Sequence, residues 1–280
     1  MKKLRLIAAL VLVAGYAQAQ YGAADSAVIV RPFKIFDNLY YVGNSFVSAY
    51  LLRTDKGLVL IDALYGKDTA YTPAAARQLG FRDKDIRYIL CTHGHYDHCE
   101  GAGFVQRMTG ARIGMTAPDW DMAEGKIKAP YTSVNNKLTR DRVIRDGDSL
   151  QMGNTTIYFF ETPGHTPGVL SMRFPVRDGN KTYTAFMFGG VGLNFDGVER
   201  TEMYLRSVDR IQKMAGIEVN ISNHPGPGKI FERARQLANR KPGDPHPFVD
   251  AAAFQSWLNE LKQGAEQKLA EEKKKAGSPH

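Results

Sequence analysis

The segment Thr92 to Gly103, THGHYDHCEGAG, constrains this chain more than any other stretch of its sequence. Three of the seven histidines and one aspartate fall within six residues: His93, His95, Asp97 and His98. The apolar run Ile86 to Cys91 directly before them predicts a short strand. His-x-His on an extended segment places two side chains on one face, where they can chelate one ion. Asp97 and His98 turn away as a helix begins, which aims them at a second ion nearby.

Two later motifs repeat this arrangement of a strand followed by a glycine-containing turn. His165 lies in TPGHTPG after the predicted strand Thr155 to Glu161, and His224 lies in SNHPGPG after Glu218 to Ile221. Loops at strand ends are where a rigid scaffold presents functional side chains. The sequence therefore predicts a set of five imidazoles and one carboxylate. His246 in GDPHPF has no such context and is expected to be structural, and His280 is the last residue.

This donor set favours zinc, which takes three protein ligands in catalytic sites and leaves one position for water. Six ligands make two such sites. Two ions roughly 3.5–4 Å apart can share one hydroxide and polarise a carbonyl or phosphoryl oxygen. We therefore expect two Zn²⁺ per chain.

Strand blocks alternate with helices along most of the chain, which predicts an α/β layered domain with helices outside the sheets. Between Thr116 and Arg142 the pattern is less regular and carries Trp120, Pro130 and Tyr131. Two interpretations of these residues, 117–142, stay open: a loop with exposed aromatic residues that overhangs a site, or a surface insertion. The predicted helix Ala251 to Lys275 ends in a charged tail, expected to be solvated and frayed.

The first nineteen residues have the pattern of a secretory signal peptide. Lys2, Lys3 and Arg5 precede an apolar run, and Ala17-Gln18-Ala19 supplies a small-x-small exit, so cleavage is expected after Ala19. The run of about ten apolar residues is shorter than the roughly 20 that span a bilayer, so no stable membrane anchor is expected. The predicted organisation is a signal peptide at 1–19, a hydrolase domain at 20–262 and a charged tail at 263–280, in an exported, periplasmic protein.

Charge and cysteine content exclude several other classes. Removal of residues 1–19 takes away three basic residues and no acidic one, so the formal charge falls from +8 to +5. This mild excess, without a dense basic block, gives no support for nucleic acid as a partner and leaves a small-molecule substrate. Cys91 and Cys99 are expected to be free, buried thiols, because a disulfide would enclose the metal-binding turn. The chain has neither a G-x-S-x-G elbow nor a phosphate-binding glycine loop.

Together these motifs resemble the metallo-β-lactamase superfamily over roughly Pro32 to Leu258. THGHYDH, TPGHTPG and SNHPG are similar to its metal motifs, and NLYYVG, LVLIDALYG, VIRDGDSLQMG and RKPGDPHPFVD are similar to the β-lactamase subclass without a cysteine ligand. The resemblance implies a four-layer αβ/βα sandwich with the zinc ions at one edge. It further implies that His93, His95 and His165 hold the first zinc, and Asp97, His98 and His224 the second. Asp62 matches an aspartate that orients the metal loop, although capping the following turn is an equal alternative.

The sequence departs from the family pattern in the segment FGGVG. Many superfamily hydrolases have a bridging aspartate here, whereas this chain has Gly189 and Gly190. That difference counts against a thioesterase or lactonase of the bridged type. The β-lactamase subclass often has serines here that bind the drug's carboxylate, whereas Gly190 and Gly192 offer only backbone N–H groups. Asn194 or Tyr131 are the alternative substrate contacts.

Three functions follow from the motifs and the resemblance. The first is an exported dinuclear zinc hydrolase that opens the β-lactam ring by attack of a zinc-bound hydroxide, with Asp97 steering the hydroxide or a proton. The second is a lactone, ester or thioester hydrolase of the same fold, since fold does not decide between an amide and an ester. The third, a non-catalytic zinc-binding envelope protein, is disfavoured because structural zinc sites are normally closed by four protein ligands. The sequence does not fix the oligomeric state.

Overall fold

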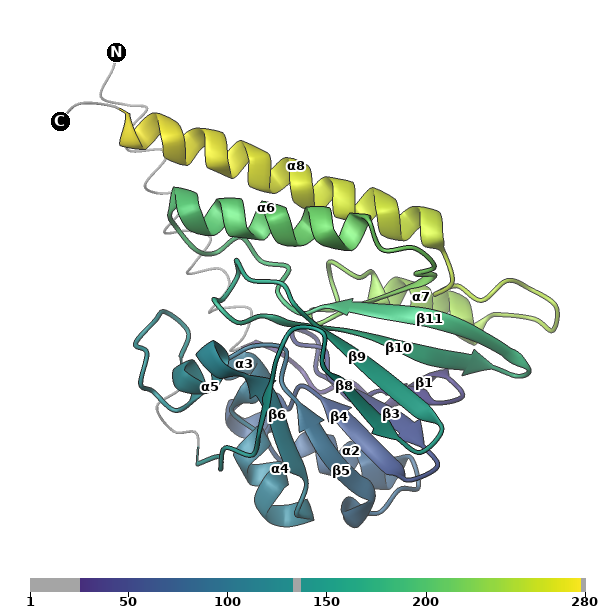
Figure 1. Ribbon diagram of the computed structural model, residues 1–280. Coiled ribbons are helices and arrows are strands. Elements are labelled where there is room, and N and C mark those ends of the chain that lie inside the picture. The colour runs from purple at the N-terminus through teal and green to yellow at the C-terminus, as the bar shows by residue number, and fades with distance from the viewer. Residues whose placement is uncertain (1–25, 133–136, 278–280) are drawn as a thin grey trace.

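The computed structural model describes residues 26–132 and 137–277, so the expected signal peptide and His280 lie outside the described residues. Two sheets form its centre (Figure 1). The first sheet has seven strands in sequence order: β1 (Phe33–Phe36), β2 (Leu39–Tyr41), β3 (Tyr50–Thr54), β4 (Gly57–Ile61), β5 (Ile86–Leu90), β6 (Arg112–Thr116) and β7 (Arg142–Ile144). Strands β1 to β4 pair antiparallel, and β4 to β7 pair parallel.

The second sheet has five strands in the order β12-β11-β10-β9-β8. Their bounds are β8 (Ser149–Met152), β9 (Thr155–Glu161), β10 (Leu170–Asp178), β11 (Lys181–Phe188) and β12 (Val219–Ser222). Strands β8 to β11 pair antiparallel, and β12 pairs parallel with β11. Consequently β9, β11 and β12 run in the same direction.

Helices cover the outer faces of the two sheets (Figure 1). The α-helices within residues 26–132 and 137–277 are α2 (Tyr71–Gln78), α3 (Tyr96–Cys99), α4 (Ala102–Thr109), α5 (Ala117–Ala123), α6 (Val198–Gln212), α7 (Ile230–Ala238) and α8 (Ala251–Ala276). Two 3-10 turns, η1 (Gly66–Asp68) and η2 (Asp83–Asp85), precede α2 and β5.

Three apolar cores lie between these layers. One joins the facing sides of the two sheets, the second joins the first sheet to α2, α4 and α5, and the third joins the second sheet to α6 and α8. Burial of apolar side chains at all three interfaces holds the layers together. The predicted four-layer αβ/βα sandwich is confirmed.

Strand direction brings the functional loops to one edge. Strands β4, β5 and β6 are parallel, so Asp62, the histidine cluster and α5 all follow carboxyl ends at the same edge of the first sheet. In the second sheet β9, β11 and β12 deliver His165, Gly189 and His224 in the same way. A hydrogen bond from the Leu170 amide to the Thr92 carbonyl, 2.7 Å long, joins the two edges.

Residues 117–142 differ from the predicted irregular loop with exposed aromatic residues. Their first part is α5, with Pro118 in the first turn, where its missing N–H costs no hydrogen bond. Trp120 is fully buried, and its indole N–H donates to the Arg142 carbonyl at 2.9 Å. Of the two interpretations left open, the overhanging loop with exposed aromatic residues does not hold for Trp120, because α5 packs this ring against the first sheet. Tyr131 of the same segment does line the pocket beside the histidines.

The C-terminal segment also differs from the expected frayed tail. Helix α8 continues to Ala276, so the expected boundary after residue 262 falls inside it. Ala265 is buried, and Glu272 accepts hydrogen bonds from the Thr201 hydroxyl at 2.7 Å and the Gly197 amide at 3.0 Å. These contacts with the start of α6 order the charged segment. Among the described helices, α8 included, none combines the length and apolar character needed to cross a bilayer.

We expect Leu258→Ala to destabilise the protein by about 2–5 kcal/mol, because Leu258 is fully buried between α8 and the second sheet. Urea unfolding followed by circular dichroism measures this change. Glu271→Ala, on the exposed side of the same helix, serves as the control and is expected to stay within about 0.5 kcal/mol of wild type. Equal unfolding midpoints for the Leu258 variant and wild type would contradict the described docking of α8.

Candidate metal centre

Asp62 links the first sheet to the histidine cluster. It stands directly after β4 with φ 57°, a left-handed conformation that aspartate tolerates better than most residues. Its carboxylate accepts hydrogen bonds from the Thr92 amide (2.7 Å), the Thr92 hydroxyl (2.9 Å) and Nδ1 of His98 (2.8 Å). A fully buried carboxylate with three donors holds both the loop and one imidazole in place.

His93, His95 and His165 form the first ligand group. Their ligand atoms lie within 4.8 Å of one another, and all three side chains are buried. Nδ1 of His93 donates to the Gly189 carbonyl at 2.9 Å, and Nδ1 of His165 donates to the Gly192 carbonyl at 2.8 Å. A carbonyl oxygen only accepts, so both imidazoles carry their proton on Nδ1.

The remaining ring nitrogens show that this group fits a cation. Nε2 of His93 and Nε2 of His165 face each other at 3.2 Å, and each presents a lone pair with no proton between them. Two facing lone pairs repel unless a positive ion lies between them. Zn–N bonds of 2.0–2.1 Å in a tetrahedron place two nitrogens about 3.4 Å apart, close to this separation. The donor chemistry and the spacing therefore both fit zinc.

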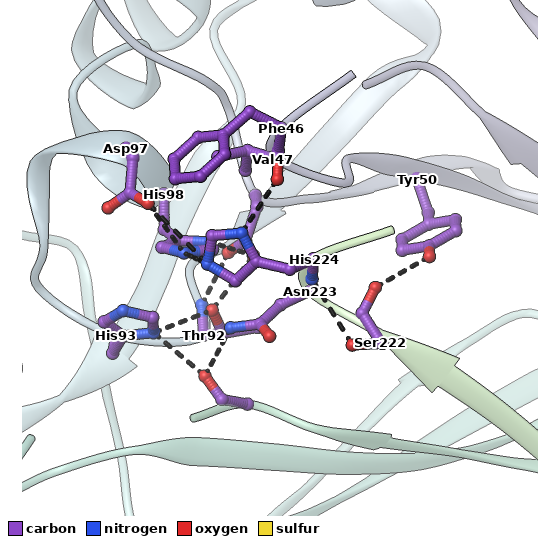
Figure 2. Close-up of polar contacts among 12 residues, drawn as sticks. Phe46, Val47, Tyr50, Thr92, His93, Asp97, His98, Ser222, Asn223 and His224 are labelled. Carbon is purple, nitrogen blue, oxygen red and sulfur yellow. Dashed lines mark hydrogen bonds and ion pairs between the residues drawn. The ribbon is translucent and has the colours of Figure 1, made fainter. Parts of the chain in front are cut away.

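Asp97, His98 and His224 form the second group (Figure 2). Nε2 of His98 lies 3.2 Å from Nε2 of His224 and 3.3 Å from Oδ2 of Asp97, and His224 lies 3.8 Å from the same oxygen. Nδ1 of His224 donates to the Phe46 carbonyl at 2.8 Å, which leaves its Nε2 for a ligand. The ligand atoms of His93, Asp97 and His98 also lie within 4.8 Å of one another, so the two groups adjoin.

Burial keeps most of these imidazoles in the neutral form that binds metal. It lowers the pKa of His165 to about 3 and holds the pKa values of His93 and His95 well below their usual range, and the neighbouring imidazoles add to this effect. The pKa of His224 is lowered for the same reasons. All four are therefore uncharged ligands at neutral pH.

His98 and Asp97 behave differently because two carboxylates face one imidazole. Burial disfavours the charged form of His98, but Asp97 and Asp62 outweigh it and raise its pKa to about 10. Burial likewise acts to raise the pKa of Asp97, and the opposing charge of His98 lowers it well below its usual range. The second group thus already holds a positive charge at its centre, which a divalent ion would replace.

A small pocket opens beside both ligand groups. Its walls are Phe46, His95, Tyr96, Asp97, Tyr131, His165, Asn194 and His224. Of the four expected substrate contacts, Tyr131 and Asn194 line this pocket. Gly190 and Gly192 instead lie against His165: a Cβ on Gly190 would come within 2.8 Å of the His165 Cβ. The Gly192 carbonyl holds the His165 ring, so this glycine acts through its oxygen rather than its N–H.

Sequence reasoning missed three residues that hold the ligands. Phe46 acts through its backbone carbonyl, which has no signature in the sequence. Arg200 in α6 donates from Nε to the Gly164 carbonyl at 2.7 Å and from its terminal nitrogen to the His165 carbonyl. Asp119 in α5 accepts from the Thr166 hydroxyl at 2.7 Å.

His246 is structural, as expected: Nε2 lies 3.0 Å from the Ile35 carbonyl and the ring stacks on Phe36. Cys91 and Cys99 are free, buried thiols.

Comparisons with known proteins identify relatives of this chain. Residues 42–178 match the family model described as the metallo-beta-lactamase superfamily. A hydroxyacylglutathione hydrolase of Methylobacterium sp. (strain 4-46) is 32% identical over 124 residues, 42% of this chain and 43% of its own length. The hydroxyacylglutathione hydrolase of Hyphomonas neptunium is 30% identical over 146 residues, which cover 51% of this chain and 51% of the length of the relative. The chain thus spans about half the length of the curated relatives that it matches.

Solved structures match over nearly their whole length. A subclass B3 metallo-β-lactamase of Bradyrhizobium japonicum superimposes with a TM-score of 0.79 at 26% identity, covering 89% of this chain and 97% of that one. A β-lactamase from Chitinophaga pinensis gives a TM-score of 0.75 at 28% identity, covering 87% and 95%.

We expect His95→Ala to lower the zinc content of the purified protein by at least one ion, because it removes one of three ligands of the first group. Metal analysis after dialysis measures the content. His246→Ala is the control, since His246 is a buried histidine without a ligand partner, and it is expected to keep the wild-type content. An unchanged content in the His95 variant would contradict the assignment.

Asp62→Asn is expected to weaken zinc binding about 10- to 100-fold, because it removes the charged acceptor of His98 and of the Thr92 hydroxyl. Competition against a chromophoric chelator measures the affinity. Asp196→Asn, an exposed aspartate paired with Lys268, is the matched control. Wild-type affinity in the Asp62 variant would show that this aspartate only caps its turn.

Proposed function

This chain carries a domain of the metallo-β-lactamase superfamily, and from that premise we propose that it is a dinuclear zinc hydrolase that opens the β-lactam ring. The observation that carries the proposal is the adjoining pair of three-residue groups, one of His93, His95 and His165 and the other of Asp97, His98 and His224, each of which contributes side chains to one pocket. Three protein ligands for each ion leave positions open for water and substrate, as in catalytic rather than structural sites. This count argues against a purely zinc-storing envelope protein.

The ions would supply Lewis acidity for the carbonyl oxygen and a water that ionises near neutral pH. Protein residues do the rest. Asp97 lines the pocket and stays ionised, so a carboxylate oxygen is available to accept a proton beside the attacked carbonyl. Phe46, Tyr96 and Tyr131 wall the pocket and exclude bulk water from the reacting atoms. Asn194 and the Tyr131 hydroxyl are the polar wall groups that can orient the substrate.

The packing around Gly189 supports a centre without a bridging aspartate. A Cβ on this residue would lie 2.1 Å from the Leu170 carbonyl oxygen. The Gly189 carbonyl also accepts from His93 and from Nδ2 of Asn223, at 2.9 Å and 2.8 Å. The contact with Leu170 leaves no room for a larger residue in the present backbone, and the two hydrogen bonds hold that backbone in place. The departure seen in the sequence is therefore built into the packing, and it supports the β-lactamase type over the bridged type.

A second candidate keeps the site and changes the substrate to a lactone, an ester or a thioester. The curated relatives favour it, since their names denote release of a hydroxyacyl group from glutathione. Their similarity covers only about half of each chain, and the packing of Gly189 against Leu170 disfavours a bridging aspartate. We therefore rank β-lactams first.

We also propose that the mature protein begins at Gln20 in the periplasm, on the signal-peptide pattern of residues 1–19. N-terminal sequencing of the protein secreted by a bacterial host tests this proposal. A retained Met1 would contradict it.

The zinc-loaded protein is expected to hydrolyse penicillin, cephalosporin and carbapenem substrates faster than a simple lactone or a thioester, and to lose activity with a chelator. Initial rates across this matched panel measure the preference. Faster turnover of the lactone or thioester would replace the β-lactam assignment with the second candidate. Lack of turnover of any substrate by the two-zinc protein would contradict hydrolysis itself.

Gly189→Asp is expected to lower zinc affinity and activity rather than create a bridging ligand, because the new Cβ meets the Leu170 carbonyl. Zinc titration and the rate on the best substrate measure both. Gly226→Ala, in the loop of His224 with open space around its α-carbon, is the matched control and is expected to behave as wild type. Tighter zinc binding by the Gly189 variant would contradict the packing argument.

A further inference from the structure

Asp119 is a buried carboxyl that the proposed chemistry does not use. Its side chain is fully buried in α5, and it neither belongs to a ligand group nor lines the pocket. Burial raises its pKa to about 7, although the Thr166 hydroxyl and the Gly168 and Gly94 amides favour the charged form. A carboxyl in a dry interior is costly unless its hydrogen bonds repay the desolvation. Its position needs a physical reason.

The contacts of α5 supply that reason, because this helix begins between two ligand-bearing loops. Asp119 accepts from the hydroxyl of Thr166, the residue after His165. In the same turn of the helix, the Thr116 hydroxyl donates to the Gly168 carbonyl. Both bonds hold the loop of His165 against α5.

The second loop meets the same helix at Gly94, the residue between His93 and His95. A Cβ on Gly94 would lie 2.7 Å from the Asp119 carbonyl oxygen and 2.8 Å from Cβ of Met122. The Gly94 backbone thus packs directly on the backbone of α5 at Asp119. The second carboxylate oxygen of Asp119, Oδ1, is buried without a hydrogen-bond partner among the described residues. One residue therefore contacts both loops that supply the first ligand group.

Asp62 offers an internal comparison. It holds His98, a member of the second ligand group, through Nδ1. Asp119 makes no such bond to a ligand ring. Its side chain accepts from Thr166, the neighbour of His165, and its backbone carbonyl lies against Gly94, the neighbour of His93 and His95. The two buried aspartates follow the parallel strands on either side of β5, Asp62 after β4 and Asp119 after β6, and so flank the cluster that follows β5.

We propose that Asp119 is a positioning residue that joins the loops of His93, His95 and His165 and so sets the metal affinity of the first ligand group separately from the second. The inference rests on the proposed function in that both need the site to bind zinc. It assigns a role to a residue outside both ligand groups. It also predicts that Asp119 acts on the first group selectively, whereas Asp62 contacts both His98 of the second group and Thr92, which precedes His93.

The test measures zinc affinity of the first group alone and of the second group alone. The variant His224→Ala disables the second group and leaves the first group intact. The variant His165→Ala disables the first group and leaves the second group intact. These two variants are the backgrounds for the test. Adding Asp119→Ala is expected to weaken zinc binding about 10- to 100-fold in the His224 background and less than about twofold in the His165 background. Chelator competition gives the affinities, and the visible absorption of the Co²⁺-substituted proteins reports the ligand geometry.

Two further variants separate positioning from general stability. Asp119→Asn keeps an acceptor for the Thr166 hydroxyl, so it is expected to lose less than about tenfold in the His224 background, and it decides the question if the alanine variant does not fold. Asp121→Asn, a surface residue of the same helix paired with Arg140, is expected to change nothing. Thermal unfolding of each metal-free protein reports stability.

The outcomes distinguish this inference from the proposed function. Selective weakening of the first group supports it. Wild-type affinity in the Asp119 variants, or equal weakening of both groups, would overturn it and leave the zinc hydrolase intact. If the unmodified protein binds no zinc, both the proposed function and this inference fail.

Discussion

The centre depends on a set of hydrogen bonds that point bare ring nitrogens at one another. His93, His165 and His224 each donate from Nδ1 to a backbone carbonyl, which fixes the tautomer and leaves Nε2 unprotonated. In a dry interior the facing lone pairs of His93 and His165 are unfavourable without a cation, whereas His224 faces the charged imidazole of His98. The remainder of the chain supplies the carbonyls and carboxylates that hold this arrangement. Metal binding is therefore expected to stabilise the folded protein.

Strand direction explains how segments far apart in sequence reach one place. Each sheet contributes three strands whose carboxyl ends lie at the same edge, and packing of the two sheets brings those edges together. The glycines at this junction serve close approach rather than flexibility. Gly189, for example, carries the acceptor of His93 while its α-carbon touches the backbone of β10.

Much of the centre could be predicted from sequence because its ligands are side chains of metal-binding types that lie in short motifs along the chain. The sequence located all six residues that the structure brings together. Four of them lie in the HxHxDH motif after an apolar run, and the other two are histidines in glycine-containing turns that follow predicted strands. The groups that orient them were harder to find. Phe46 and Gly192 act through carbonyl oxygens, and Asp119 contacts its loops only after the strands have paired. Asp62 was recognised, but sequence alone did not separate its contact with His98 from a turn cap.

The errors in the fold have a similar origin. The irregular pattern around Trp120 left open a loop with exposed aromatic residues or a surface insertion, whereas a short helix packs the indole into the core. The charged end of α8 was expected to fray, since composition does not reveal that Glu272 meets Thr201 and Gly197. In both cases tertiary contacts, which no local pattern encodes, decided the outcome.

Anomalous diffraction at the zinc edge from crystals of the zinc-loaded protein would test the central claim most directly. The account predicts two peaks about 3.5–4 Å apart. One should lie about 2.1 Å from Nε2 of His93 and His165, and the other at that distance from Nε2 of His98 and His224. A single peak closed by four protein ligands, or no peak within reach of these nitrogens, would contradict a dinuclear catalytic centre.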